Sequence, residues 1–162
     1  MKTYLLALAL LISSLCSSQI QKRSISDYDK LIEINPAIIS NYYDRGLLKF
    51  EEGDFSGAIF DFDVVIDNDS KNVNALYNRA LSKAEINDTA GAINDFSKIL
   101  IIDSSNSDVY FKRSFLNASI GNKSQACLDA KKAISLGSPS SNDIEIISQD
   151  SYYKDKGMVM TA

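Results

Sequence analysis

The sequence predicts an all-α protein, an α-solenoid of about three stacked helical hairpins. Three observations support this prediction. An arginine recurs at steps of 34 residues, at Arg45, Arg79 and Arg113. The same step relates small residues, aspartates and aromatic residues at other positions of the chain. Two amphipathic helices of about 14 residues and two short turns fill one such step, so each step corresponds to one hairpin.

The first 18 residues have a character of their own. Lys2 precedes an apolar run and then small residues, the pattern of a signal peptide cleaved after Ser18. An uncleaved anchor is one alternative, but a membrane-spanning helix needs about 20 apolar residues, and this run is shorter. Lipid attachment at Cys16 is a second alternative. It is not favoured, because the bacterial lipid-attachment pattern has Gly, Ala or Ser before the cysteine and this chain has Leu15. We therefore expect an exported protein, periplasmic or secreted.

The first hairpin explains why its repeated positions are occupied as they are. Tyr42, Gly46 and Phe50 share one face of the first helix at four-residue spacing. The corresponding face of the second helix is apolar and consists of Ala58, Phe62, Val65 and Ile66. Small residues let the two backbones approach each other. Gly53 is expected to end the first helix, and Asp54 is expected to cap the second by accepting from free backbone amides. Asp88 and Asn122 are the helix-starting residues at the same position of the next two units.

These residues resemble the tetratricopeptide repeat family. The resemblance rests on the small residue after each arginine and on further matching positions: Asn35-Pro36, Gly53-Asp54-Phe55, Ala58 and Phe62. It implies three units, 39–72, 73–106 and 107–140, arranged in a right-handed superhelix whose first helices line a concave face. The third unit departs from the family pattern because Ala130 stands where a bulky residue is usual. Serine replaces the usual closing proline of each unit, at Ser70, Ser104 and Ser138.

Both ends of the array are expected to differ from the repeated units. Residues 19–38 resemble a half repeat that contains only the second helix, and Asp27 falls in the aspartate position of that helix. At the other end a solenoid exposes the apolar face of its last unit and needs a cap. We expect residues 141–156 to form a capping helix, with one side made of Ile144, Ile147 and Tyr152. Residues 157–162 are expected to be a flexible tail.

The repeated arginines allow two interpretations. As a functional feature, they would bind acidic ligands through bidentate contacts. As an architectural feature, each would pair with the aspartate that recurs at the same step, at Asp61, Asp95 and Asp129. The second interpretation is favoured because a ligand-binding arginine does not require a repeated aspartate. Lys49 and Lys83, one turn further along, are expected to share those carboxylates.

The resemblance also implies a set of residues on the concave face. These candidate partner-binding residues are Tyr43, Leu47, Tyr77, Asn78, Leu81, Phe111, Lys112 and Phe115. Some family members hold a carboxyl-terminal peptide with a cluster of lysine, asparagine and arginine, and of the matching positions here only Asn78 agrees fully and Lys112 in part. A dicarboxylate clamp is therefore not expected. Large side chains can anchor an extended or helical peptide, or the same residues can simply pack the first helices together.

Composition excludes several other functions. The net charge is −4, and −5 without residues 1–18, so a nucleic-acid partner is not expected. The chain has no histidine, the commonest general base and metal ligand. Cys127 falls at the position of Ile59 and Ile93 and is expected to replace a buried aliphatic side chain. We expect no enzyme, catalytic residue, metal, cofactor or small-molecule substrate.

The sequence as a whole favours an exported scaffold that binds a partner protein or peptide on the concave face of the array. The alternative is a periplasmic, chaperone-like accessory factor that holds envelope or outer-membrane components through the same surface. Residue usage resembles small proteins of Bacteroidota, so a position at the periphery of the outer membrane is a further expectation.

Overall fold

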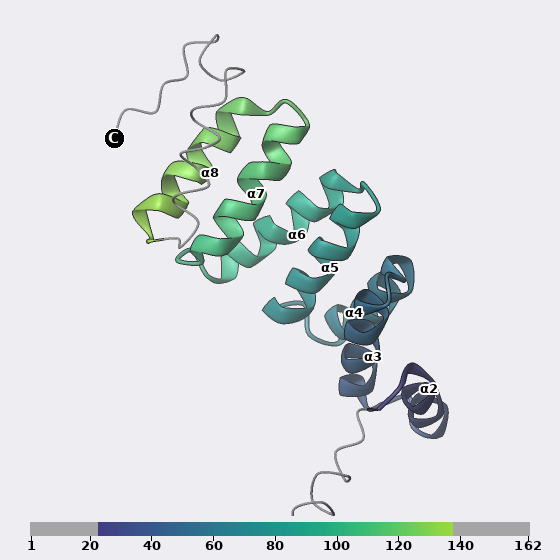
Figure 1. The fold of residues 1–162 in the computed structure, drawn as a ribbon. Helices are drawn as coiled ribbons and strands as arrows, with labels where there is room; N and C mark the ends of the chain where they lie inside the picture. Colours follow the sequence, from purple (N-terminus) through teal and green to yellow (C-terminus); the bar gives the residue numbers. More distant parts are fainter. Residues whose placement is uncertain (1–22, 138–162) are drawn as a thin grey trace, which may run out of the picture.

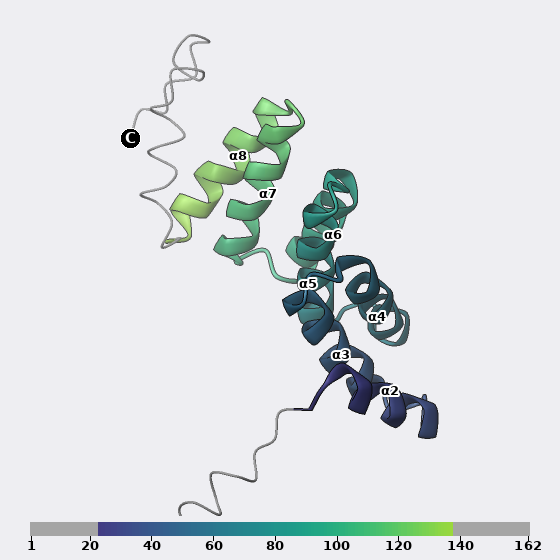
Figure 2. The same cartoon turned by 45° about the vertical axis from the view of Figure 1, so that its right-hand side comes forward.

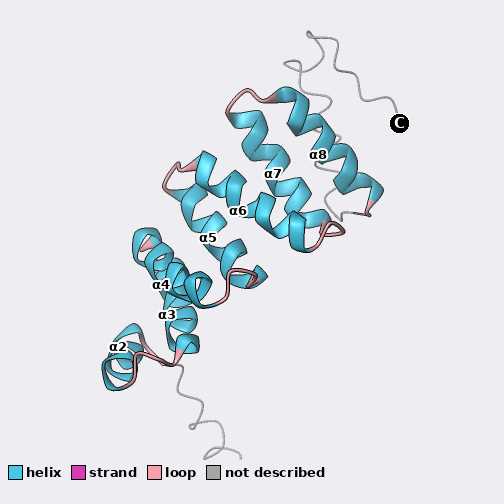
Figure 3. Ribbon diagram, turned by 180° about the vertical axis from the view of Figure 1, so that it is seen from behind, coloured by secondary structure: helices cyan, strands magenta, loops and turns pink. Residues whose placement is uncertain are grey.

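The structure is a computed structural model and describes residues 23–137. Every regular element in this range is a helix, as Figure 3 shows. The described helices are α2 (Ile25–Ile34), α3 (Ile39–Glu51), α4 (Phe55–Asn68), α5 (Val73–Glu85), α6 (Thr89–Ile102), α7 (Ser107–Ser119) and α8 (Lys123–Ser135). None of them combines the length and the apolar character that crossing a bilayer requires. The predicted signal peptide, capping helix and tail lie outside the described residues.

The helices pack in consecutive pairs, which confirms the predicted solenoid of helical hairpins. The pairs are α3 with α4, α5 with α6, and α7 with α8. Their first helices begin at Ile39, Val73 and Ser107, so the 34-residue step of the sequence is the spacing of the hairpins. Contacts of α4 with α5 and of α6 with α7 join the pairs, and α2 packs on α3 with no paired first helix among residues 23–137 (Figures 1 and 2).

Each hairpin closes through a turn that repeats at the same step. Gly53, Asn87 and Gly121 all have a positive φ, between 63° and 83°, which reverses the chain between the two helices. Glycine adopts this conformation without strain, and asparagine tolerates it better than most residues. The short turn therefore brings the second helix directly back onto the first.

Two of the three second helices begin with a side-chain cap, including the one expected at Asp54. The side chains of Asp54 and Asp88 accept hydrogen bonds from backbone amides three residues further on. Asn122 starts α8, as expected, but its side chain makes no capping bond and donates instead to Oδ1 of Asn117. An amide side chain can donate as well as accept, so its local partner decides its role.

The core lies between the two helix layers and becomes less bulky along the array. Phe62 and Phe96 are fully buried at equivalent positions of α4 and α6, where α8 has Ala130. A Cβ atom on Gly46 would lie 2.9 Å from Cε1 of Phe62, so the glycine makes room for the ring. In α8 only small residues, Ala130 and Ala133, form the buried cluster. The last hairpin thus buries less apolar volume than the first two.

Candidate functional site

The candidate residues lie on α3, α5 and α7, and their surface is called the first-helix surface below. Tyr43 and Tyr77 occupy equivalent positions and pack against the phenylalanine of their own hairpin. Their rings lie 5.9 Å from Phe62 and 5.8 Å from Phe96, centroid to centroid. Both tyrosines are therefore part of the hairpin packing, and both are only partly buried.

The third hairpin departs from this arrangement because it lacks a second-helix phenylalanine. Phe111 packs against the small residues of α8, and its ring stands edge-on to Phe115 at 4.8 Å. Phe115 is 41% exposed. In the first two hairpins the equivalents of Phe115 are Leu47 and Leu81, which are half-buried. Only in the third hairpin does this position place a large ring at the surface.

Polar side chains connect the first helices of neighbouring hairpins. Asn78 donates from Nδ2 to the hydroxyl of Tyr43 at 3.1 Å, and the hydroxyl of Tyr77 donates to Oδ2 of Asp108 at 2.6 Å. The Lys112 ammonium lies 5.9 Å from the centroid of the Tyr77 ring. Burial, and then the bond to the Asp108 carboxylate, raise the pKa of Tyr77, so the phenol stays protonated and keeps donating.

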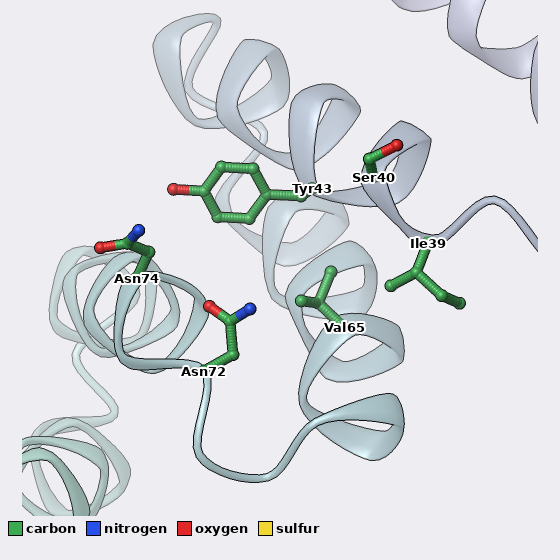
Figure 4. A pocket seen from close by; sticks show the side chains of 6 residues that line it. All are labelled: Ile39, Ser40, Tyr43, Val65, Asn72 and Asn74. Carbon is green, nitrogen blue, oxygen red and sulfur yellow. The ribbon is translucent and has the colours of Figure 1, made fainter. Parts of the chain in front are cut away.

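A pocket of about 350 Å³ opens between α3 and α5. Its lining combines apolar and uncharged polar side chains: Ile39, Ser40, Tyr43, Val65, Asn72 and Asn74 (Figure 4). Of the predicted residues only Tyr43 lines it. The remaining five were missed because they lie at helix starts and on the second helix, where the repeat pattern indicates caps and packing.

The first helices on the two sides of α5 are connected by different residues. Asp108 of α7 occupies the position that Asn74 has in α5. Asp108 accepts from Tyr77 and so bridges α5 and α7. Asn74 makes no such bond to Tyr43, whose hydroxyl accepts from Asn78 instead. Each gap is therefore crossed by a hydrogen bond, from Asn78 between α3 and α5 and to Asp108 between α5 and α7.

The repeated arginines are architectural, as the favoured interpretation predicts. Arg79 donates from Nε and Nη2 to both carboxylate oxygens of Asp95, at 2.8 and 2.6 Å, and Asp95 is completely buried. Arg45 and Arg113 make the same bidentate contact to the aspartate of their own hairpin. As expected, Lys83 shares the carboxylate of Asp95 at 2.8 Å.

Each arginine also contacts the preceding second helix, which the repeated arginines and aspartates alone do not predict. The third nitrogen, Nη1, donates to Asp29 from Arg45 and to Asp63 from Arg79. In the last hairpin Nη1 of Arg113 donates to Ser97 Oγ at 2.9 Å. These acceptors also recur at a step of 34, which is the signal that could have identified them. One guanidinium thus joins three helices.

Two further expectations need correction. Asp27 does not join the arginine pairs; its carboxylate accepts from the backbone amide of Ser24 and closes a capping box at the start of α2. Without a first helix in this half unit, no arginine lies opposite it among the described residues. Cys127 is only partly buried, as are Ile59 and Ile93, because this position lies at the border of the helix layers. No metal-binding group of side chains occurs in residues 23–137.

Comparison with known proteins extends this description. No protein-family model and no curated protein matches the sequence. Among solved structures, a crystal structure of MamA superposes with a TM-score of 0.75 at 20% identity, covering 83% of this chain and 77% of that one. A tetratricopeptide repeat protein from Parabacteroides merdae gives 0.67 at 21% identity, covering 72% of this chain and 46% of that one.

A third solved structure is the second TPR of Spaghetti (RPAP3), bound to the HSP90 peptide SRMEEVD. Its TM-score is 0.58 at 25% identity, covering 63% of this chain and 94% of that one. The helix pairs at a constant 34-residue step agree with these likenesses. The chain therefore has the tetratricopeptide repeat fold.

Proposed function

We propose that this protein is a non-catalytic interaction module that binds an extended peptide segment of a partner protein across the first-helix surface. An aliphatic side chain of that segment occupies the pocket between α3 and α5, and the surrounding polar side chains bind its main chain. The observation that carries this proposal is the lining of the pocket, in which two aliphatic side chains, Ile39 and Val65, adjoin four uncharged polar ones.

The polar lining suits peptide main chain. The Tyr43 hydroxyl accepts from Asn78, so its own proton remains available to a ligand. Asn74 is exposed at the rim and carries both an amide donor and a carbonyl acceptor, the complement of a peptide unit. Hydrogen bonds to main chain together with a pocket for one side chain are a common mode of peptide recognition.

The pocket also indicates which peptides it disfavours. No charged residue lines it, so nothing in it compensates the desolvation of a carboxylate. The solved RPAP3 repeat is bound to an acidic HSP90 peptide, SRMEEVD. That structure supports the proposal that this fold binds a peptide. The uncharged lining of the pocket here favours a peptide with an aliphatic side chain over one with an acidic terminus.

The place of action is part of the proposal. The signal-peptide pattern of residues 1–18 supports export, so the partner is an envelope or secreted protein. A chaperone-like factor would use the same surface for many unfolded chains without preference. The two functions differ in the number of partners and in their dependence on the pocket.

The test is affinity capture from envelope extract with residues 19–162 as bait, compared between two variants. Asn74→Arg places a long cation at the rim of the pocket, and Asn94→Arg makes the same change at an exposed position of α6. We expect one stoichiometric partner, captured at least about tenfold less by Asn74→Arg, since about 1.4 kcal/mol of binding free energy corresponds to that factor.

Asn94→Arg should capture that partner as well as the unchanged chain does, and both variants should keep the circular dichroism spectrum. Equal capture by both variants would place the partner elsewhere than this pocket. Capture of many unfolded proteins, unaffected by either change, would support the chaperone-like alternative instead.

A further inference from the structure

The third hairpin, α7 with α8, lacks several stabilising contacts that the first two hairpins share. Phe62 and Phe96 are fully buried between the helices of their hairpins, and Ala130 occupies the equivalent position of α8. Burial of apolar surface stabilises a fold roughly in proportion to the area buried. The core of the third hairpin therefore contributes less to its stability than the cores of the other two contribute to theirs.

The buried carboxylate of the third hairpin is also compensated less well. Lys49 and Lys83 form ion pairs with the buried aspartates of the first two hairpins. The equivalent residue of α7 is Asn117, whose Nδ2 lies 3.4 Å from Oδ2 of Asp129. A neutral amide stabilises a carboxylate less than an ammonium group does, because only the ammonium adds a charge of opposite sign.

The start of α8 lacks a side-chain cap, and a neighbouring residue explains why. In α4 the capping side chain of Asp54 lies against Gly57, where a Cβ atom would be 2.1 Å from Oδ2 of the cap. The residue of α8 at the position of Gly57 is Gln125, and Asn122 makes no capping bond. A side chain at 125 thus takes the space that a cap needs. The helix begins without the stabilisation that a side-chain cap gives.

The junction between the second and third hairpins has less charge attraction than the earlier junctions. In the first two hairpins, Nη1 of the arginine donates to a carboxylate of the preceding second helix. In the third, Nη1 of Arg113 donates to the hydroxyl of Ser97. A hydroxyl carries no net charge, so the Coulomb attraction of the earlier junctions is missing here. The hydrogen bond of Tyr77 with Asp108, which also crosses this junction, lies on the exposed surface.

We propose that the third hairpin opens as a unit, so that α7 and α8 unfold while α2 to α6 stay folded. Opening exposes Leu100 of α6, which α7 covers in the closed state, and the open state is therefore the minor one. Stability that differs between neighbouring parts of a chain permits such partial unfolding. The inference concerns the protein without a partner and does not depend on the proposed function.

The opening divides the first-helix surface into a permanent and a conditional part. The pocket between α3 and α5 is lined by residues of α3, α4, α5 and the turn before α5, so it is complete without α7. Phe111, Lys112 and Phe115 belong to the surface only in the closed state. A ligand that contacts these three residues binds the closed state better and shifts the population toward it.

Hydrogen exchange followed by mass spectrometry, on the chain of residues 19–162 without a partner, tests the proposal. We expect the amides of α7 and α8 to exchange together, at least about tenfold faster than those of α5 and α6, because the open state exposes them alone. Ser97→Asp supplies Arg113 with a carboxylate. It should slow the exchange of α7 and α8 by about two- to fivefold, the effect of one added ion pair near the surface.

The control is Ser97→Asn, which has nearly the same shape as Ser97→Asp but no charge and should not slow that exchange. Circular dichroism should show the same helix content in all three chains. Exchange of α7 and α8 at the rate of α5 and α6 would show one cooperative unit and overturn the proposal, as would fast exchange confined to the last turn of α8. Equal exchange in the two variants would also overturn it, because the uncharged junction would then not govern the opening.

Discussion

At the scale of residues, the repeated aspartates are charged side chains buried inside the fold. Asp61 and Asp95 are completely buried, and Asp129 nearly so. A buried carboxylate is costly unless it is paired and hydrogen-bonded. Each one accepts two bonds from the arginine of its hairpin, and Asp61 and Asp95 are also paired with a lysine. These buried ion pairs therefore determine how the two helices of a hairpin pack against each other.

The two acceptors of Arg79 should differ greatly in their effect on stability. Removing one partner of a buried pair costs about 3 to 5 kcal/mol, so Asp95→Ala should lower the free energy of unfolding by that amount. Asp63 contacts the same guanidinium but its side chain is 46% exposed. Asp63→Ala should cost about 1 kcal/mol or less. Urea denaturation measures both, and equal losses would contradict this assignment of burial and pairing.

Asp95 should also make stability depend on acidity. Burial raises its pKa, but the hydrogen bonds from Arg79 and Lys83 outweigh burial and hold the pKa below the ordinary value of 3.8. A carboxyl with a lowered folded pKa contributes stability that is complete above the unfolded value and is lost as the pH falls through the folded value. The free energy of unfolding should therefore fall below about pH 4, and less steeply in Asp95→Asn. Identical slopes in urea titrations would contradict this contribution.

At the scale of elements, small residues set how closely the two helices of a hairpin approach. Ala92 of α6 is fully buried, while Ala90 of the same helix is exposed. Ala92→Leu should overpack the hairpin and cost about 1 to 3 kcal/mol. Ala90→Leu adds the same atoms in solvent and should leave stability almost unchanged. A melting curve of Ala92→Leu that coincides with that of Ala90→Leu would remove Ala92 from the core.

The elements themselves were predictable from the sequence, because helix periodicity, turn residues and caps all follow the same 34-residue step. Asp54 and Asp88 illustrate this, since they cap as the sequence predicts. Asn122 also starts its helix, but its side-chain amide donates to Asn117 instead of accepting a capping bond. Such a choice depends on the distance between two side chains, which spacing along the chain does not specify.

Part of the candidate site could not be predicted for a similar reason. The repeat pattern correctly indicated the aromatic positions of the first helices, and Tyr43 lines the pocket. Asn74 lines the pocket, whereas Asp108 at the equivalent position of the next hairpin accepts from Tyr77. This is a difference between repeats, whereas a repeat pattern reports what the repeats have in common.

At the scale of the whole molecule, each repeated arginine joins three helices: the two helices of its own hairpin and the preceding second helix. This contact links a hairpin to its predecessor as well as closing the hairpin itself. Quasi-one-dimensional arrays depend on such contacts between neighbours, because no contact spans the whole molecule. We infer that the arginines hold the array together and do not bind the partner.

The unfolding free energy of Arg79→Met, measured in urea without any partner, tests this claim most directly. Methionine keeps much of the apolar stem but leaves Asp95 buried without its main partner, so we expect a loss of about 3 to 5 kcal/mol. Arg23→Met, at an exposed position before α2, should leave stability unchanged. An Arg79→Met chain as stable as the unchanged protein, but deficient in capturing its partner, would show that the arginine is a binding residue and would contradict the account.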